Sequence, residues 1–360
     1  MGVSTPTPYA SLREIEADAT RNLDRATWDY VEGGANGEIS LVANTEAFDE
    51  WQFLPRLLSS SARPELAVEY LGLRCAMPLF IGPFGFDRAY HRDGYAAVAR
   101  AAKAAGIPSI VPDTSSQSLE EIAAASGQDR GFVHLSLHGP AEDLLAYANR
   151  AAAAGYRGIV FTDVPAVPWR ERLFESRQDL IAMWGLGNFG EGLADPELLR
   201  ETRTFRSPRW TWERLGDLAQ ALPLPFVMKG VLRGADAELA VGAGAAAIYV
   251  SNFGGRNLDT TTPPMTQLRE VVAAVNGAVP VLVDSGVRRG VHVAKALALG
   301  ATAVGIGRLA VRGLAAAGES GVAATLDLLQ RELASTLSYL GCDSVADLSP
   351  ELLRRSERAR

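Results

Sequence analysis

Residues 246–259 read A-A-I-Y-V-S-N-F-G-G-R-N-L-D, and this stretch decides the fold. An apolar run with β-branched and aromatic residues stops abruptly at Ser251-Asn252, and two glycines and Arg256 follow. Such a run is typical of a buried parallel strand whose C-terminal end lies at an active site, because barrel enzymes carry their catalytic groups at these strand ends. Phe253 occupies the point where the strand becomes a loop, so the chemistry available at this position bears directly on function.

The same rhythm recurs from residue 77 onward, where short apolar segments alternate with alanine-rich segments of helical periodicity. Strands are predicted at residues 79–83, 109–111, 132–137, 158–162, 226–229, 246–252, 279–284 and 303–307. Helices are predicted at residues 94–105, 119–125, 141–154, 211–221, 235–241, 265–275 and 291–299, and glycines at 106, 155, 244 and 300 are typical of C-caps. Eight such units predict a closed (β/α)8 barrel of the TIM type, in the α/β class, rather than an open doubly wound sheet.

The chain of 360 residues is long for one ordinary domain but normal for a single barrel domain spanning residues 1–360. Residues 9–60 form a predicted helical appendage. In it Ser11 and Glu14 have capping-box spacing, and residues 26–30 and 44–48 read as helical. An extended segment should then follow, with Trp51, Phe53, Leu54 and Leu57 as packing residues, and helices at 313–340 should cover the outside of the barrel.

The connection after the fourth strand, residues 164–207, is unusually long. Long loops in compact domains are usually functional or disordered. We interpret this one as a lid over the strand ends, with a solvated excursion as the alternative.

Composition and charge argue against several classes of function. The net charge is −7 and no basic block is present, which argues against nucleic acid as a partner. Cys75 and Cys342 are too far apart to suggest a disulfide framework or a metal site, and they fit a reducing compartment. The N-terminus has no signal-peptide pattern, and the longest apolar run, residues 239–250, is too short for a membrane span. We therefore predict a cytoplasmic protein without a membrane partner.

Polar residues stand at the predicted ends of the last four strands. They are Lys229; Ser251, Asn252 and Arg256; Asp284, Gly286 and Arg288; and Gly307 and Arg308. The loops after strands seven and eight are where barrels most often hold phosphate. These glycines would let the backbone approach a ligand while the arginines supply charge, so a phosphorylated cofactor or substrate is predicted there. A loop glycine beside a surface arginine is the alternative.

Lys229 ends an apolar run, so its ammonium group is predicted to be partly buried. A cation at this point would stabilise negative charge on the pyrimidine edge of a flavin. A structural ion pair with a barrel carboxylate is the alternative.

Together these motifs resemble the FMN-dependent 2-hydroxy-acid oxidases and dehydrogenases, over residues 9–348. The matching pieces are D-Y at 29–30 with G-A at 34–35, V-M-K-G at 227–230, S-N-x-G-G-R-x-L-D at 251–259, D-x-G-x-R-R-G at 284–290 and G-I-G-R at 305–308. The resemblance implies FMN as the cofactor, a small carboxylate substrate, and a homo-oligomer, often a tetramer.

The resemblance also implies individual roles. Lys229 would lie at the N1–O2 edge of the flavin, and Asp284, Gly286, Arg288, Gly307 and Arg308 would hold the ribityl chain and phosphate. Pro83, Phe84, Gly85 and His134 would line the flavin, as would Ser251 or its neighbours. Tyr30, Arg170 and Arg256 would hold the substrate carboxylate, which suits guanidinium groups because they bind carboxylates bidentately.

Several positions depart from the family pattern. Phe253 stands where the family has a histidine base, and phenylalanine cannot accept a proton. A positioned general base contributes about two to four orders of magnitude in rate. His134 and Ser136 replace a glutamine at the flavin and a tyrosine near the substrate, whereas the aspartate that orients the family histidine matches Asp163. On the second and fourth strands, Pro112 and Phe161 replace a serine and a threonine.

Three hypotheses follow, with Tyr30, His134, Asp163 and Phe253 as the candidate catalytic positions. The preferred one is an FMN-dependent oxidoreductase that moves hydride from a carboxylate-bearing substrate to flavin N5 without a histidine base, as an amine or another activated C–H bond would allow. The second is 2-hydroxy-acid oxidation with a relocated base, His134 first and His138 next. The third is a catalytically inactive FMN-binding protein.

Aromatic residues at 84, 86, 161 and 253 further predict an apolar pocket for a larger or aromatic substrate.

Overall fold

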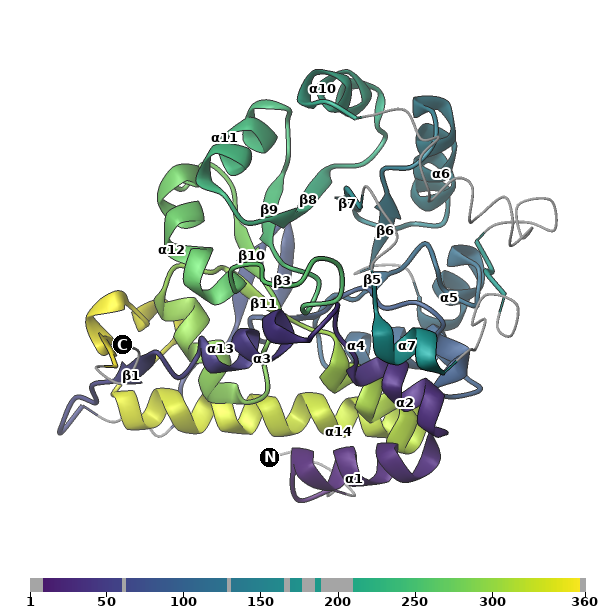
Figure 1. Cartoon of the computed structure of the whole chain (residues 1–360). Helices are drawn as coiled ribbons and strands as arrows, with labels where there is room; N and C mark the ends of the chain where they lie inside the picture. Colours follow the sequence, from purple (N-terminus) through teal and green to yellow (C-terminus); the bar gives the residue numbers. More distant parts are fainter. Residues whose placement is uncertain are drawn as a thin grey trace.

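Eight parallel strands form the centre of the molecule, at the places that the sequence predicts (Figure 1). The computed structural model describes residues 9–59, 63–127, 131–164, 169–176, 185–188 and 210–356. The strands are β4 (Leu79–Ile81), β5 (Ile110–Val111), β6 (Phe132–Ser136), β7 (Ile159–Thr162), β8 (Phe226–Val231), β9 (Ala247–Val250), β10 (Val281–Val283) and β11 (Ala303–Ile306). They pair in the order β4-β11-β10-β9-β8-β7-β6-β5, and a parallel bridge between Ile81 and Ser109 joins the two outer strands. The sheet is thereby closed into the predicted (β/α)8 barrel.

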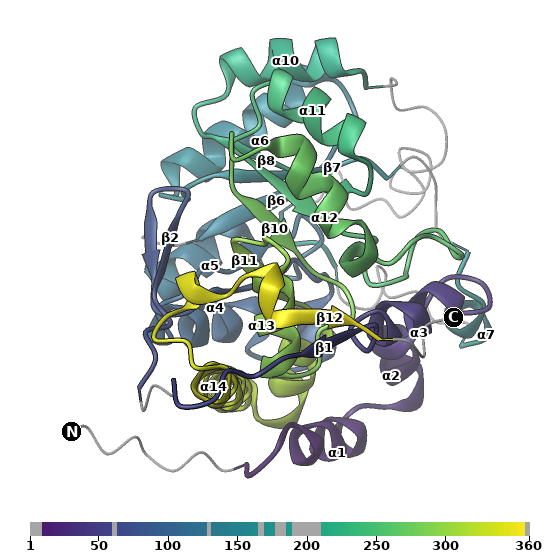
Figure 2. The same cartoon turned by 90° about the vertical axis from the view of Figure 1, so that its left-hand side faces the viewer.

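Helices follow the strands and surround the barrel (Figures 1 and 2). They are α4 (Gly94–Ala104), α5 (Leu119–Ser126), α6 (Ala141–Ala153), α10 (Trp212–Ala221), α11 (Gly234–Gly242), α12 (Pro264–Val275), α13 (Gly290–Ala298) and α14 (Arg308–Leu340). The four glycines predicted as C-caps, at 106, 155, 244 and 300, all have positive φ. The last helix, α14, begins at the end of β11, five residues before the predicted start, and packs against α1, α4 and α13.

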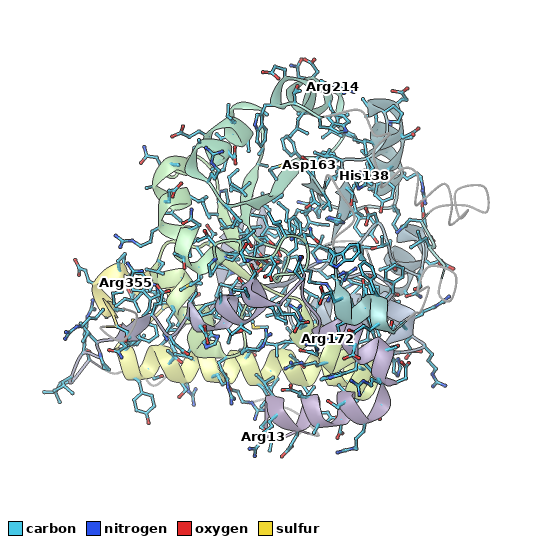
Figure 3. The ribbon with its side chains drawn as sticks, in the orientation of Figure 1. Arg13, His138, Asp163, Arg172, Arg214 and Arg355 are labelled. Carbon is cyan, nitrogen blue, oxygen red and sulfur yellow. The ribbon has the colours of Figure 1, made fainter. Side chains whose placement is uncertain are left out.

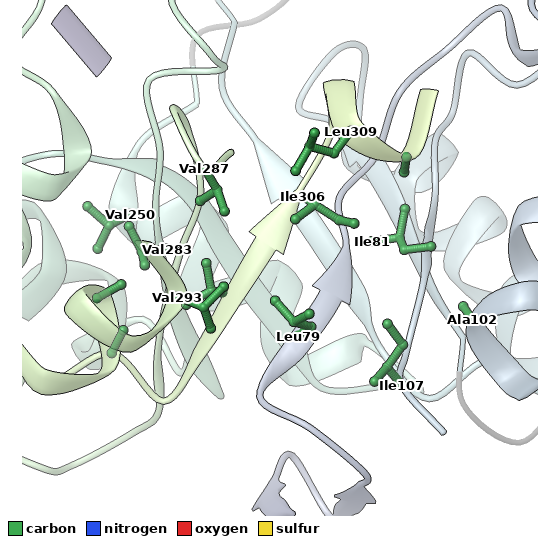
Figure 4. Close-up of a cluster of buried hydrophobic side chains, with 14 of the residues drawn as sticks. Leu79, Ile81, Ala102, Ile107, Val250, Val283, Val287, Val293, Ile306 and Leu309 are labelled. Carbon is green, nitrogen blue, oxygen red and sulfur yellow. The ribbon is translucent and has the colours of Figure 1, made fainter. Parts of the chain in front are cut away.

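Side chains along each strand alternate between the barrel interior and the surrounding helices. Phe80, Tyr249 and Leu282 belong to the inner cluster. A hairpin that the sequence analysis did not predict, β2 (Val68–Tyr70) and β3 (Leu73–Cys75), packs against the same cluster. Leu79 and Ile81 belong to the outer cluster and contact the helices (Figure 4). Because apolar side chains fill the interior, polar chemistry is left to the C-terminal strand ends.

The N-terminal appendage contains α1 (Leu12–Asn22), α2 (Arg25–Glu32), α3 (Ile39–Glu46) and β1 (Trp51–Phe53), which pairs antiparallel with β12 (Leu353–Arg355). Ser11 caps α1 as predicted, by accepting the backbone N–H of Glu14. The prediction for Leu54 and Leu57 is wrong, because these side chains are 50% and 90% exposed. They lie beyond the end of β1, so they have no strand partner to pack against.

Much of the predicted lid, residues 164–207, lies outside the described residues. The short helix α7 (Glu171–Glu175) belongs to it and contacts α2. Arg172 on this helix forms ion pairs with Asp29 and Glu38. Leu186 packs against Phe86, in a second described piece of the same connection. Both pieces contact the barrel or its appendage, and the lid itself stays a prediction.

No helix in the described ranges has the length and apolar composition needed to cross a bilayer. The single domain, the cytoplasmic location and the homo-oligomer predicted from the sequence stay predictions.

Candidate active site

A cavity of about 340 Å³ lies at the C-terminal ends of the barrel strands. Each of the eight strands contributes to its wall, through Pro83, Pro112, His134, Thr162, Lys229, Phe253, Asp284 and Gly307 in strand order. Tyr30 from α2 and Arg170 from the predicted lid complete it. The cavity therefore brings together most of the site residues predicted from widely separated parts of the sequence.

The ends of β10 and β11 carry two buried guanidinium groups. Arg308 donates to three backbone oxygens, those of Val31, Gly254 and Gly33, at 2.9, 3.0 and 2.9 Å. Burial lowers the pKa of Arg308 to about 9 and also lowers the pKa of Arg288. Neither side chain forms an ion pair with a carboxylate among the described residues. Because a buried charge is costly unless it is paired, this edge of the cavity fits an anion.

Gly307 and Gly286 serve different purposes at this edge. A Cβ atom on Gly307 would meet no other atom within 4 Å, so it would project into open space at the start of α14. Helix N-termini bind anions through their free N–H groups. A Cβ on Gly286 would instead lie 2.0 Å from the backbone oxygen of Asn44, and the φ of Gly286 is +86°. Glycine at 286 is thus required by packing against α3, whereas glycine at 307 keeps the anion site open.

Lys229 lies in the inner wall of the cavity and is only 4% exposed. Its Nζ atom donates to Ser251 Oγ at 2.8 Å and lies 3.8 Å from Asp284 Oδ2. Burial lowers the pKa of Lys229, and Asp284 partly offsets this shift. The lysine therefore has a carboxylate partner and also reaches the cavity, and its place at the edge of a flavin stays a prediction.

Ser251 is fully buried and is not among the residues that line the cavity. Its hydroxyl oxygen accepts hydrogen bonds from Lys229 Nζ and from the backbone N–H of Phe253, at 2.8 and 3.0 Å. The prediction that Ser251 or its neighbours line the flavin stays a prediction, and of these residues Phe253 reaches the cavity. Ser251 fixes the two neighbours that do reach the cavity.

Phe253 has a left-handed backbone, with φ of 59°, and its ring forms part of the cavity wall. The ring centroid lies 4.1 Å from Lys229 Nζ, a cation–π contact. Gly230 makes room for it, since a Cβ there would lie 2.8 Å from the tip of the Phe253 ring. An apolar ring thus occupies the wall where the resemblance predicts a base.

Tyr30, Arg170 and Arg256 form one cluster, as the resemblance implies. The two guanidinium carbons lie 5.1 and 4.6 Å from the Tyr30 ring centroid. Arg256 donates to the backbone oxygen of Val31 at 3.0 Å. Arg170 Nε and Arg256 Nη2 are buried and have no hydrogen-bond partner within the described ranges. Burial and the neighbouring Arg256 lower the pKa of Arg170 to about 10. Unsatisfied, buried N–H groups on two adjacent cations fit a carboxylate.

His134 is paired with an aspartate that the sequence analysis did not identify. Its Nδ1 atom lies 3.3 Å from Asp113 Oδ1, and the two side chains are 12% and 8% exposed. Asp113 Oδ2 also accepts the backbone N–H of Ser136 at 3.0 Å. The contact with His134 is electrostatic, because Nδ1 makes no hydrogen bond to a described residue. Asp113 lies two residues after the end of β5, so its place near the end of a predicted strand was the available signal.

Two strand-four predictions change in the structure. Phe161 points outward into the helix layer, and Thr162 takes the inward position and lines the cavity. The prediction that Phe161 lines the pocket is therefore wrong, and Thr162 is the strand-four side chain that faces the cavity. Asp163 is exposed and is not among the cavity-lining residues. Partial desolvation by its surroundings raises the pKa of Asp163, and the nearby His138 partly offsets this shift (Figure 3).

The predicted aromatic lining holds in part. Phe84 and Phe253 line the cavity, whereas Phe86 packs against Tyr30 and Leu186 behind the wall. Tyr90, which the sequence analysis missed, also lines the cavity and donates to the backbone oxygen of Gly85 at 2.9 Å. This bond supports the Pro83–Gly85 loop predicted to lie along the flavin.

Comparison with known proteins identifies the family. The model of the FMN-dependent dehydrogenases matches residues 19–355. An L-lactate oxidase of Nostoc sp. is 38% identical, over 95% of this chain and 97% of its own. A 4-hydroxymandelate oxidase of Amycolatopsis orientalis is 39% identical, over 94% and 96%. A solved mandelate oxidase with (S)-4-hydroxymandelic acid superposes with a TM-score of 0.89 at 37% identity, over 97% of this chain and 99% of the other. The chain belongs to the FMN-dependent dehydrogenase family and is an oxidoreductase of the 2-hydroxy-acid oxidase type, with FMN as its cofactor.

Proposed function

We propose that the protein oxidises small 2-hydroxy acids to 2-oxo acids, with His134 in place of the family base. The observation that carries this proposal is the buried His134–Asp113 pair, with 3.3 Å between Nδ1 and Oδ1, in the same cavity as Arg170 and Arg256. The relatives named above are oxidases of lactate and 4-hydroxymandelate, both 2-hydroxy acids.

Arg170 and Arg256 bind the substrate carboxylate in this proposal. Each has a buried N–H group that no described residue satisfies, and each stacks on the Tyr30 ring, which fixes its plane. Their positions are held from outside the cavity. The ion pairs of Arg172 attach α7 to the appendage, and Arg256 is attached to the end of α2 through Val31. A carboxylate held by two arginines leaves C2 and its hydroxyl in a fixed orientation.

His134 accepts the hydroxyl proton. The carboxylate of Asp113 beside Nδ1 favours the tautomer with the proton on that atom, which leaves Nε2 as the acceptor. When bound, FMN supplies the two-electron acceptor that takes the C2 hydrogen of the substrate as a hydride. The O–H bond breaks toward His134 and the C2–O bond becomes a carbonyl, so the products are a 2-oxo acid and one proton on the protein.

The cofactor would be held by the anion site and by Lys229. Arg288, Arg308 and the open N-terminus of α14 fit the phosphate. Lys229 Nζ, oriented by Ser251 and Asp284, places a buried cation where it stabilises negative charge on the cofactor. The Pro83–Gly85 loop supplies an apolar wall.

Base-free oxidation of a carboxylate-bearing amine or another activated substrate, the preference from sequence, is the second candidate. It is favoured by Phe253, whose ring brings no base to the end of β9. The charge of the cavity opposes it. Five cationic side chains line the cavity beside two carboxylates, those of Asp113 and Asp284. A substrate ammonium group would add to this positive charge, so an anionic hydroxy acid is the better match.

The test compares substrates and two histidine variants. Protein loaded with FMN is mixed anaerobically with lactate, glycolate, mandelate, alanine or phenylglycine, and bleaching of the flavin absorbance is followed. We expect bleaching by at least one hydroxy acid and a loss of about 10²–10⁴-fold in rate for His134→Gln. His91→Gln is the control, because His91 does not line the cavity. Bleaching by amino acids alone, or an unchanged rate in His134→Gln, would reject the proposed base.

A further inference from the structure

Three polar side chains follow one another along the inner face of β6 and its continuation. His134, Ser136 and His138 occupy alternate positions, and all three line the cavity. His134 and Ser136 are alternate residues of β6, so they lie on one face, about 6.8 Å apart along the chain. His138 follows after the turn that ends the strand, and the three side chains form a polar row in the cavity wall.

One carboxylate, that of Asp113, contacts both residues at the inner end of this row. Asp113 lies 3.3 Å from His134 Nδ1 with one oxygen, and accepts the Ser136 N–H at 3.0 Å with the other. The first two members of the row therefore share a fixed anion, which holds their spacing.

The outer end of the row reaches solvent. After β6 the chain turns sharply, with the N–H of His138 donating to the backbone oxygen of Ser136 at 2.7 Å. His138 interacts electrostatically with Asp163, which is exposed (Figure 3). Asp163 matches the family aspartate that orients the histidine base. In this chain its histidine neighbour is His138, on a different strand.

The proposed reaction requires a route by which His134 can release its proton, and this row of side chains could provide one. His134 gains one proton in each turnover and must lose it before the next. Its side chain is 12% exposed, so direct release to solvent is restricted. Ser136 carries a hydroxyl group, which can accept one proton and donate another. An imidazole such as that of His138 can accept a proton on one nitrogen and release one from the other, which suits a proton shuttle.

We propose that His134, Ser136 and His138 form a proton-release path along β6, with Asp163 holding His138 at its outer end. This inference rests on the proposed function. The proton leaves His134 Nε2, passes by way of the Ser136 hydroxyl and intervening water to His138, and leaves His138 for bulk water. Only O–H and N–H bonds break and form along the path. The two electrons of the oxidation have already been transferred to FMN, so no further oxidant is needed.

If the path operates, its loss should lower the rate of repeated turnovers and leave the rate of a single turnover unchanged. In His138→Gln, one anaerobic round of flavin bleaching by a hydroxy acid should keep its rate, because His134 still accepts the first proton. Steady-state kcat should fall about 10-fold or more, and added imidazole should restore it. In His134→Gln the single round itself should be lost. Asp163→Asn should resemble His138→Gln with a smaller effect.

Two controls complete the test. His91→Gln should leave both rates unchanged. A histidine-labelled NMR spectrum of the protein without substrate, which has four histidines, should show the His138 ring signals displaced by Asp163→Asn. An unchanged kcat in His138→Gln, no rescue by imidazole, or undisplaced ring signals would overturn the path. Failure of the wild type to oxidise any hydroxy acid would instead reject the proposed function, and the path with it.

Discussion

The ammonium group of Lys229 lies 4.1 Å from the centroid of the Phe253 ring. The ring therefore covers a buried cation at the place where the family pattern has a histidine. A neighbouring cation lowers the pKa of a histidine, so an imidazole introduced here would stay neutral and able to accept a proton.

We expect Phe253→His to restore a base at the end of β9. In a His134→Gln background, the double variant should regain hydroxy-acid oxidation by about 10–100-fold, because a positioned base contributes at least that much. Phe253→Leu is the matched control, since it keeps an apolar side chain and adds no base. Anaerobic flavin bleaching measures the rates. An equal gain with Phe253→Leu would show that the ring matters for space alone.

The carboxylate site predicts a selective loss of substrate affinity. Arg170→Met and Arg256→Met should each lower kcat/KM for a hydroxy acid by about 10–100-fold, as removal of a charge-assisted hydrogen bond costs roughly 1.5–3 kcal/mol. The methyl ester of the same acid should be affected far less, because it carries no charge for the arginine to bind. Equal losses for acid and ester would contradict the assignment.

The two glycines of the anion site should respond in opposite ways to alanine. Gly307→Ala adds a Cβ where the structure has no neighbour within 4 Å, so the fold should be retained and FMN affinity should fall. Gly286→Ala places its Cβ 2.0 Å from the oxygen of Asn44, so thermal stability without FMN should fall. Fluorescence titration with FMN and thermal melts separate these effects. If Gly307→Ala left the FMN affinity unchanged, the phosphate would not bind beside Gly307.

The buried His292 side chain should make the stability of the fold depend on pH. Burial lowers the pKa of His292 to about 4, and its Nδ1 accepts the backbone N–H of Arg288 at 3.2 Å. The unfolded chain protonates this histidine near pH 6.5, whereas the folded chain stays neutral. Stability is therefore fully present above pH 6.5 and is lost as the pH falls toward 4, by about 3 kcal/mol. His292→Gln should be less stable at pH 7 and should lose less on acidification. If the melting temperatures of the wild type and His292→Gln fell equally between pH 7 and pH 4.5, this assignment to His292 would be wrong.

The barrel was predictable because strand and helix patterns alternate eight times along the chain, and each of the eight barrel strands overlaps a predicted one. The place of Arg288 and Arg308 in the cavity wall was also predictable, since both follow the last two strands of the barrel, and their binding of phosphate stays a prediction. The error at Phe161 has a simple cause. A resemblance aligns letters, whereas inward or outward orientation depends on counting alternate residues, and this counting places Thr162 inside.

The histidine pairs were not predictable from the sequence. Asp113 and His134 are 21 positions apart in the chain and meet only because β5 and β6 are neighbours in the barrel. Ser251 shows the same limit, because its contact with Lys229 depends on the pairing of β8 with β9. Local sequence shows which residues lie near strand ends, and strand register decides which of them face each other.

The most direct test of the account is the rate of anaerobic flavin bleaching by a 2-hydroxy acid in the wild type and in His134→Gln. We predict bleaching by a hydroxy acid in the wild type, none by the matching amino acid, and a fall of about 10²–10⁴-fold in the variant. Bleaching of equal rate in both proteins would contradict the central claim that the buried His134–Asp113 pair provides the base.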